Sequence, residues 1–160
     1  MATYSPKQFM NQVSSIVNSF KAEMTVALEV AVFAAEEHFD DSFKNQGFTD
    51  STLKPWAPNA ANTVERKGHD TILHNTGKLR DSRQRSVGNI GGNKIGSVWY
   101  KAMDHNVDYA YKNNNGFTND FGKVPARKFL GKSKKLDARI KGIFRDRIRM
   151  IFNRNWTIGR

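Results

Sequence analysis

The chain contains no cysteine and no long apolar run, and both absences exclude whole classes of protein. Without cysteine there is no disulfide framework and no cysteine-ligated zinc site, which fits a reducing cytoplasm. The most apolar stretch, Thr25 to Ala35, is interrupted by Glu29 and is far shorter than the roughly 20 residues of a membrane span. Residues 1–12 lack the charged start and apolar run of a secretory signal. We therefore expect a soluble protein that is intracellular when made and does not contact membranes.

Recognisable catalytic signals are also lacking. Around His69 and His74 no acidic residue completes a metal-ligand spacing. No glycine-rich phosphate loop is present, since Gly91 and Gly92 belong to a turn rather than to a strand-to-helix junction. No serine or threonine stands in a nucleophile motif. We therefore expect no enzyme, no metal site and no cofactor.

Acidic residues are scarce relative to basic ones: 15 Asp and Glu stand against 26 Lys and Arg, which leaves a formal charge of +11. This balance favours anionic partners such as nucleic acid or an acidic protein surface. An ordinary solvated basic surface explains it equally well. Apolar residues reach only 38%, so part of the chain is expected to be loop or arm rather than core.

The first 45 residues carry the strongest helical pattern. Ser5-Pro6-Lys7-Gln8 reads as a capping box with proline at the first helical position, and Tyr4 and Phe9 occupy the positions of a hydrophobic staple. Apolar residues then recur every three or four positions. The pattern predicts one long helix to about Phe43, ended by Gly47.

The apolar face of this helix is wider than one small sheet can cover. Val30 and Phe33 lie beside the main stripe and widen it. The extra surface can be wrapped by the following loop or packed against another subunit. We place Val30 and Phe33 among the candidate interface residues.

Residues 72–82 are predicted to form a short helical turn between a helical and a strand-rich half. Asn75 and Thr76 can both cap a helix, Gly77 permits a chain reversal, and Leu79 points inward. Strands over 83–90 and 94–100 are then predicted to pair as an antiparallel hairpin. A third strand or short helix is expected over 107–111, with a chain break at 113–116.

Two segments lack periodicity and are predicted to be loops. Residues 48–70 contain two prolines and scattered apolar groups, of which Trp56 is expected to anchor the segment to the core. Residues 62–67 could form one helical turn, and no more. Residues 117–131 form the second loop.

Ser133 is expected to cap a final amphipathic helix with an apolar face and a basic face. Arg139, Arg145 and Arg149 on the basic face are candidate contacts to nucleic acid or an acidic partner. The order helix, strands, helix predicts a single α+β domain over 1–160. Its expected parts are a long helix (1–45), an extended loop (46–71), a region of sheet and loops (72–131), a C-terminal helix (132–154) and a tail (155–160).

Nucleic-acid binding is the main alternative from the residues alone. Four aromatic residues could stack bases if they share an exposed sheet face, namely Trp99, Tyr100, Tyr109 and Tyr111. No helix-turn-helix, zinc or RNP-type pattern accompanies them. The alternative is therefore a basic protein that contacts the DNA backbone without reading its sequence.

Three segments in a fixed order carry a family resemblance, and Trp56 with Pro58 precedes them. They are Ile72-Leu73-x-x-Thr76-Gly77-x-Leu79-x-x-Ser82, then Tyr109-Ala110 with Gly116, then Pro125-Ala126-Arg127-x-Phe129-Leu130-Gly131. Together they resemble the Mu-like virion morphogenesis proteins of tailed phages, which complete the tail and join it to the head. The family often carries a histidine or glutamine shortly before the glycine, in a Tyr-Ala-x-x-His-Gln-x-Gly form, whereas this chain has Tyr-Lys-Asn-Asn-Asn over 111–115.

The resemblance implies a non-enzymatic structural subunit located in the virion. Its implied partners are further copies in an oligomeric ring and other neck, connector or tail-tube proteins, with possible non-specific DNA contact. Trp56, Arg80, Arg127 and Phe129 then become candidate interface residues. Arg127 offers a planar fork for a carboxylate on its own subunit or on the next.

Overall fold

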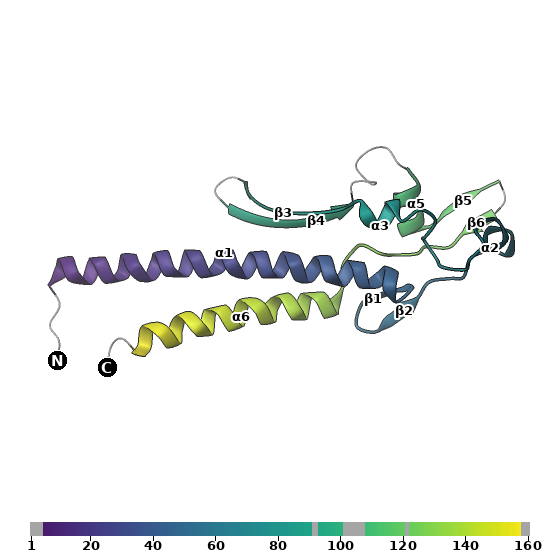
Figure 1. The fold of residues 1–160 in the computed structure, drawn as a ribbon. Helices are drawn as coiled ribbons and strands as arrows, with labels where there is room; N and C mark the ends of the chain where they lie inside the picture. The colour runs from purple at the N-terminus through teal and green to yellow at the C-terminus, as the bar shows by residue number, and fades with distance from the viewer. Residues whose placement is uncertain (1–4, 91–92, 101–107, 121, 158–160) are drawn as a thin grey trace.

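The computed structural model describes residues 5–90, 93–100, 108–120 and 122–157. Its fold is mixed α+β, as predicted: a long N-terminal helix and a C-terminal helix are combined with two-stranded antiparallel sheets (Figure 1).

Helix α1 (Pro6–Lys44) confirms the long N-terminal helix. The capping box forms, since the Ser5 amide donates to Gln8 Oε1 at 2.8 Å and the Gln8 amide donates back to Ser5 Oγ. Tyr4, the other half of the predicted staple, lies outside the described residues.

The predicted stop at Gly47 is wrong. Asn45 is the C-cap of α1, and Gln46 takes the left-handed conformation with φ 49°. Gly47 instead begins strand β1 (Gly47–Thr49), which pairs with β2 (Leu53–Pro55). A Cβ at Gly47 would lie 2.6 Å from the Lys54 carbonyl oxygen, so glycine is needed here for β1 and β2 to approach each other closely.

Helix α6 (Lys134–Thr157) and the hairpin of β3 (Arg83–Ile90) and β4 (Asn93–Tyr100) lie along different sides of α1 (Figure 1). Both elements were predicted, although α6 runs three residues past the expected end. Ser133 caps α6 by accepting the Leu136 amide at 3.2 Å. The hairpin pairs Arg83 with Tyr100 and Ile90 with Asn93, and the intervening residues 91–92 lie outside the described part.

The predicted loop over 46–71 is partly wrong, because it holds the β1–β2 hairpin and helix α2 (Ala61–Lys67). The seven residues of α2 exceed the single turn expected. Gly68 ends α2 in the left-handed conformation, with φ 73°. Strands of three residues are too short to show an alternating pattern, which explains why the sequence missed them.

The second predicted loop, over 117–131, is also partly wrong. It contains a hairpin of β5 (Phe117–Asn119) and β6 (Gly122–Val124). Before it, helix α5 (Asp108–Asn115) includes the asparagines that were expected to break the chain, and only Gly116 ends it, with φ 77°. Tyr109 and Tyr111 are therefore on a helix and cannot share a sheet face with the β4 aromatics.

Helix α3 (Lys78–Asp81) is the short turn predicted at 72–82. Gly77 itself occupies the N-cap position with φ 77°, and no side chain caps the helix, so the predicted caps Asn75 and Thr76 are wrong. Leu79 is buried as expected, and β3 begins directly after the turn.

The core gathers where the C-terminal end of α1 meets the short elements. Phe43 lies at its centre, with ring centroids 5.7 Å from Trp56 and 5.4 Å from Phe129. Trp56 Nε1 donates to the Lys128 carbonyl at 2.7 Å, which confirms Trp56 as an anchor. The cluster comprises Phe39, Phe43, Phe48, Trp56, Leu79, Ala110, Phe129 and Leu136.

Candidate functional site: a basic pocket and an exposed helix arm

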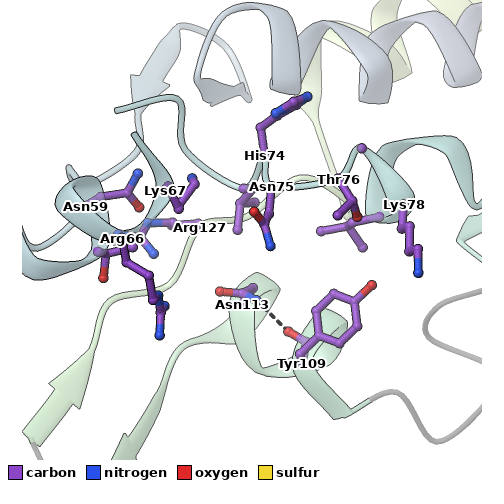
Figure 2. Close-up of a pocket in the computed structure, with 14 residues that line it drawn as sticks. Asn59, Arg66, Lys67, His74, Asn75, Thr76, Lys78, Tyr109, Asn113 and Arg127 are labelled. Atoms are coloured by element: carbon purple, nitrogen blue, oxygen red, sulfur yellow. Dashed lines mark hydrogen bonds between the residues drawn. The ribbon is translucent and has the colours of Figure 1, made fainter. Parts of the chain in front are cut away.

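A pocket of about 800 Å³ opens between α2, α3 and α5. All three segments that carry the family resemblance contribute to its lining: Thr76 and Leu79 from the first, Tyr109 from the second and Arg127 from the third. Segments far apart in the sequence therefore meet around one cavity (Figure 2).

Four basic side chains line this pocket, and they come from separate elements: Arg66 and Lys67 from α2, Lys78 from α3, and Arg127 from the chain that follows β6. None of the described residues that line the pocket is acidic. Figure 2 shows Arg66, Lys67 and Arg127 on one side and Lys78 on the other. The pocket is therefore a concentration of positive charge.

Arg127 is fixed by main-chain carbonyls rather than by a carboxylate. Its Nε donates to the Ala57 carbonyl at 3.0 Å and its Nη2 to the Pro58 carbonyl at 2.8 Å. No described residue forms an ion pair with it, so the intramolecular salt bridge considered from the sequence is not found among the described residues, and a carboxylate on a neighbouring subunit stays a prediction. Burial lowers the pKa of Arg127.

The pKa of Lys67 is affected by this concentration of positive charge. Burial and then the neighbouring Arg127 lower the pKa of its ammonium group, whereas Asp70 raises it to a smaller extent. The ammonium group donates to the Thr71 carbonyl at 2.6 Å. An anion entering the pocket would relieve the repulsion between Lys67 and Arg127.

Two of the six candidate interface residues lie in the core. Trp56 is 6% exposed and Phe129 is fully buried, so these two predictions are wrong: their apolar rings fill this chain's own interior. Arg80 and Arg127 are partly exposed but are held by contacts within the chain. The isolated sequence pattern could not distinguish a buried anchor from a surface one.

Val30 and Phe33 remain exposed, at 39% and 48%. Helix α6, the β3–β4 hairpin and β1 all contact α1, but none of them buries these two side chains (Figure 1). The Arg85 guanidinium lies 5.3 Å from the centre of the Phe33 ring. Their role at a subunit interface stays a prediction.

The basic face of α6 is partly neutralised by α1. Arg139 pairs with Glu37 at 2.7 Å, and Arg147 and Arg154 both pair with Glu23. Of the three cations proposed from the sequence, Arg139 is therefore engaged. The other two, Arg145 and Arg149, are exposed and form no ion pair with any described residue.

The N-terminal part of α1 is an apolar arm that sequence reasoning missed as a separate feature. It spans residues 6–20, all of which are exposed. Its large apolar side chains are Phe9, Met10, Val13, Ile16, Val17 and Phe20, at 38–61% exposure. The unequal predicted lengths of the two long helices could have revealed it, since the shorter cannot cover the longer.

The described part of the chain has no helix that is both long and apolar enough to cross a membrane. It also brings no three His, Asp or Glu side chains together in an arrangement that could hold a metal ion. His69 and His74, the pair weighed from the sequence, meet in an edge-on ring contact with centroids 5.5 Å apart.

The chain matches no protein-family model, no curated protein sequence and no solved structure.

Proposed function

We propose that the protein is a structural subunit of a tailed-phage virion that forms an oligomeric ring at the neck or tail end and joins the tail to the head. The ordered motifs supply the family resemblance. The single observation that carries the proposal is the apolar arm, residues 6–20, which this chain leaves uncovered.

The arm follows from the lengths of the two long helices. At 1.5 Å per residue, the 39 residues of α1 span about 58 Å, whereas the 24 residues of α6 span about 36 Å. Helix α6 therefore runs beside only part of α1, and the arm projects past it (Figure 1). A neighbouring subunit would supply the cover that α6 does not.

The chemistry of the arm suits a helix-to-helix contact. Between Gln8 and Phe20 the sequence contains no charged residue, although the chain as a whole carries +11. Two copies of this face can approach without bringing like charges together. Burying a large apolar side chain contributes about 1.5–3 kcal/mol, so several such side chains can hold a subunit contact.

The convergence of the motif segments supports the same proposal. Ile72 and Leu73 pack against the core that contains Leu79, Ala110 and Phe129, all of which belong to the motifs. Residues shared by a family for structural reasons are expected to meet in this way. The subunit body and the arm then have separate roles, folding and assembly.

Sedimentation velocity on the purified full-length chain tests assembly. We expect oligomers whose mass falls towards the monomer in the triple variant Phe9→Ser, Ile16→Ser, Phe20→Ser. The matched control is Leu53→Ser, Ile95→Ser, Tyr111→Ser, which removes exposed apolar groups elsewhere and should leave the mass unchanged. A wild-type chain that stays monomeric at every concentration would contradict the proposal.

Assembly alone does not establish a neck function. Electron microscopy of wild-type protein mixed with purified phage tails should show rings at one tail end. Rings that form but never associate with tails or virions would support an oligomer while contradicting the neck function.

A second candidate function is DNA backbone binding, which Arg145 and Arg149 favour because they are exposed and form no ion pair within the described ranges. Binding should then weaken steeply with salt concentration. In Arg145→Gln, Arg149→Gln the affinity should fall and the salt dependence should become shallower. Absence of binding to duplex DNA at about 50 mM salt would remove this candidate.

A further inference from the structure

Six arginines outside the pocket reach carboxylates on α1. The pairs are Arg80–Asp40, Arg83–Asp40, Arg85–Glu36, Arg139–Glu37, Arg147–Glu23 and Arg154–Glu23. The four pocket cations form no ion pair with any residue in the described ranges. Their charge is therefore available to an external anion.

We propose that this pocket binds the phosphate groups of a nucleotide or of a nucleic-acid strand. Arg66, Lys67, Lys78 and Arg127 line one cavity from two helices, α2 and α3, and the segment that follows β6. A single carboxylate from a partner chain would neutralise only one of them. Phosphate groups, which carry more charge and more acceptor oxygens, match the set better.

Two hydrogen bonds to main-chain carbonyls preorganise Arg127 for phosphate binding. The Ala57 and Pro58 carbonyls each take one guanidinium N–H, and a guanidinium has five. The group is therefore held in one orientation while further N–H donors remain. Binding to a fixed guanidinium loses less side-chain entropy than binding to a free one.

Neutral groups complete a lining suited to a nucleotide. Asn75, Thr76 and Asn113 add amide and hydroxyl groups that can donate to phosphate oxygens or base edges. Tyr109 is 42% exposed and offers a ring on which a base can stack. The volume of about 800 Å³ falls within the range of small-molecule sites.

Two carboxylates lie near the pocket without lining it. Asp70 raises the pKa of Lys67, but less than Arg127 lowers it. A side-chain oxygen of Asp81 lies 3.0 Å from the position that a Cβ on Gly77 would take, beside the α3 end of the pocket. Neither carboxylate forms an ion pair with a pocket cation among the described residues, so the positive charge inside remains.

Isothermal titration calorimetry of the full-length chain with tripolyphosphate, ATP and a short oligothymidylate tests the inference, which does not depend on the neck function. The pocket variant is Arg66→Gln, Lys78→Gln, because neither side chain bonds to another residue in the described part of the chain. The control is Lys135→Gln, Lys141→Gln, which removes two positive charges from exposed positions of α6.

We expect the pocket variant to weaken binding by roughly tenfold or more and the control by less than about twofold. Pocket-dependent binding of tripolyphosphate and ATP alone identifies a nucleotide-like ligand. Pocket-dependent binding of the oligothymidylate as well identifies a nucleic-acid strand. Equal losses in both variants, or no binding of any probe at low salt, would overturn the proposal.

Chemical labelling of the wild-type chain gives a readout that needs no variant. Tripolyphosphate should protect Lys67 and Lys78 from acetylation while leaving Lys141 reactive. Equal protection of all three lysines would show general surface charge instead and would likewise overturn the proposal.

Discussion

The guanidinium of Arg80 holds the carboxylate of Asp40 through two parallel hydrogen bonds, from Nε at 2.7 Å and from Nη2 at 2.8 Å. Arg83 binds the same carboxylate, whose side chain is only 11% exposed. The contact joins α3 and the start of β3 to α1 across 40 residues of sequence. Among the contacts of Asp40, the hydrogen bond from Arg80 contributes most to lowering its pKa.

The first prediction is that Asp40→Asn destabilises the fold in a pH-dependent way. The pKa of Asp40 is lower in the folded chain than the ordinary value near 4, so its contribution is complete above that value and is lost as pH falls through the folded pKa. We expect the free energy of unfolding to drop by about 1–2 kcal/mol at pH 7. Urea denaturation at several pH values should show the difference from wild type shrinking below about pH 4.

Asp41→Asn is the matched control for Asp40. Its carboxylate is 52% exposed and pairs only with Lys44 among the described residues, at 3.3 Å. The free energy of unfolding should change by less than about 0.5 kcal/mol. Equal effects of the two substitutions would show that the Arg80 contact contributes no stability.

The second prediction concerns two neighbours in α3. Leu79 is 6% exposed within the core, whereas Lys78 is exposed. Leu79→Asp places an unpaired charge among apolar groups and should abolish folding or assembly. Lys78→Ala should leave the thermal midpoint within about 1–2 °C of wild type. Circular dichroism melts of both variants provide the measurement, and the reverse result would contradict this account of the turn.

The sequence predicted the elements whose pattern repeats. The long helices show their periodicity over many turns, and both predicted starting caps, Ser5 and Ser133, are confirmed. The β3–β4 hairpin was predicted because strand-forming residues flank a strong turn signal. In contrast, β1, β2, β5 and β6 are three residues each and contain no repeat that a pattern could reveal.

The sites were less predictable, because they depend on contacts between distant residues. Arg127 was recognised as important, but its partners are main-chain carbonyls 69 and 70 residues away, which carry no sequence signal. Likewise, nothing local links Lys67 to Lys78 or Arg127. The sequence around an aromatic residue such as Phe129 does not show whether its ring fills the core of its own subunit or a pocket on a neighbouring one.

The third prediction compares the two helix caps. Ser133 is 2% exposed, accepts the Leu136 amide and donates to the Thr49 carbonyl at 2.9 Å, which ties α6 to β1. Ser133→Ala should lower the free energy of unfolding by about 1–2 kcal/mol. Ser5→Ala, at the exposed start of the arm, should cost about 0.5 kcal/mol or less. Denaturant titration distinguishes them, and a larger loss at Ser5 would show that the arm is part of the cooperative fold of the monomer.

The last prediction concerns the place where β4 crosses α1. A Cβ at Gly96 would lie 2.2 Å from Val32 Cγ2, and the stiff branched side chain of valine cannot turn away freely. Gly96→Ala should therefore cost about 1–3 kcal/mol. Combining it with Val32→Ala should cost less than the sum of the two single changes, because removal of Val32 Cγ2 makes room for the new Cβ at position 96.

Gly88 on the paired strand provides the control for Gly96. A Cβ there meets nothing within 4 Å, and Gly88 lies opposite Ile95, one residue before Gly96. Gly88→Ala should be neutral or stabilising by up to about 1 kcal/mol, because alanine restricts the unfolded chain. If both glycine variants lost equal stability, the cause would be the flexibility of the hairpin. If Gly96→Ala alone were destabilised and Val32→Ala relieved it, close packing of the hairpin on α1 would be the reason that position 96 needs glycine.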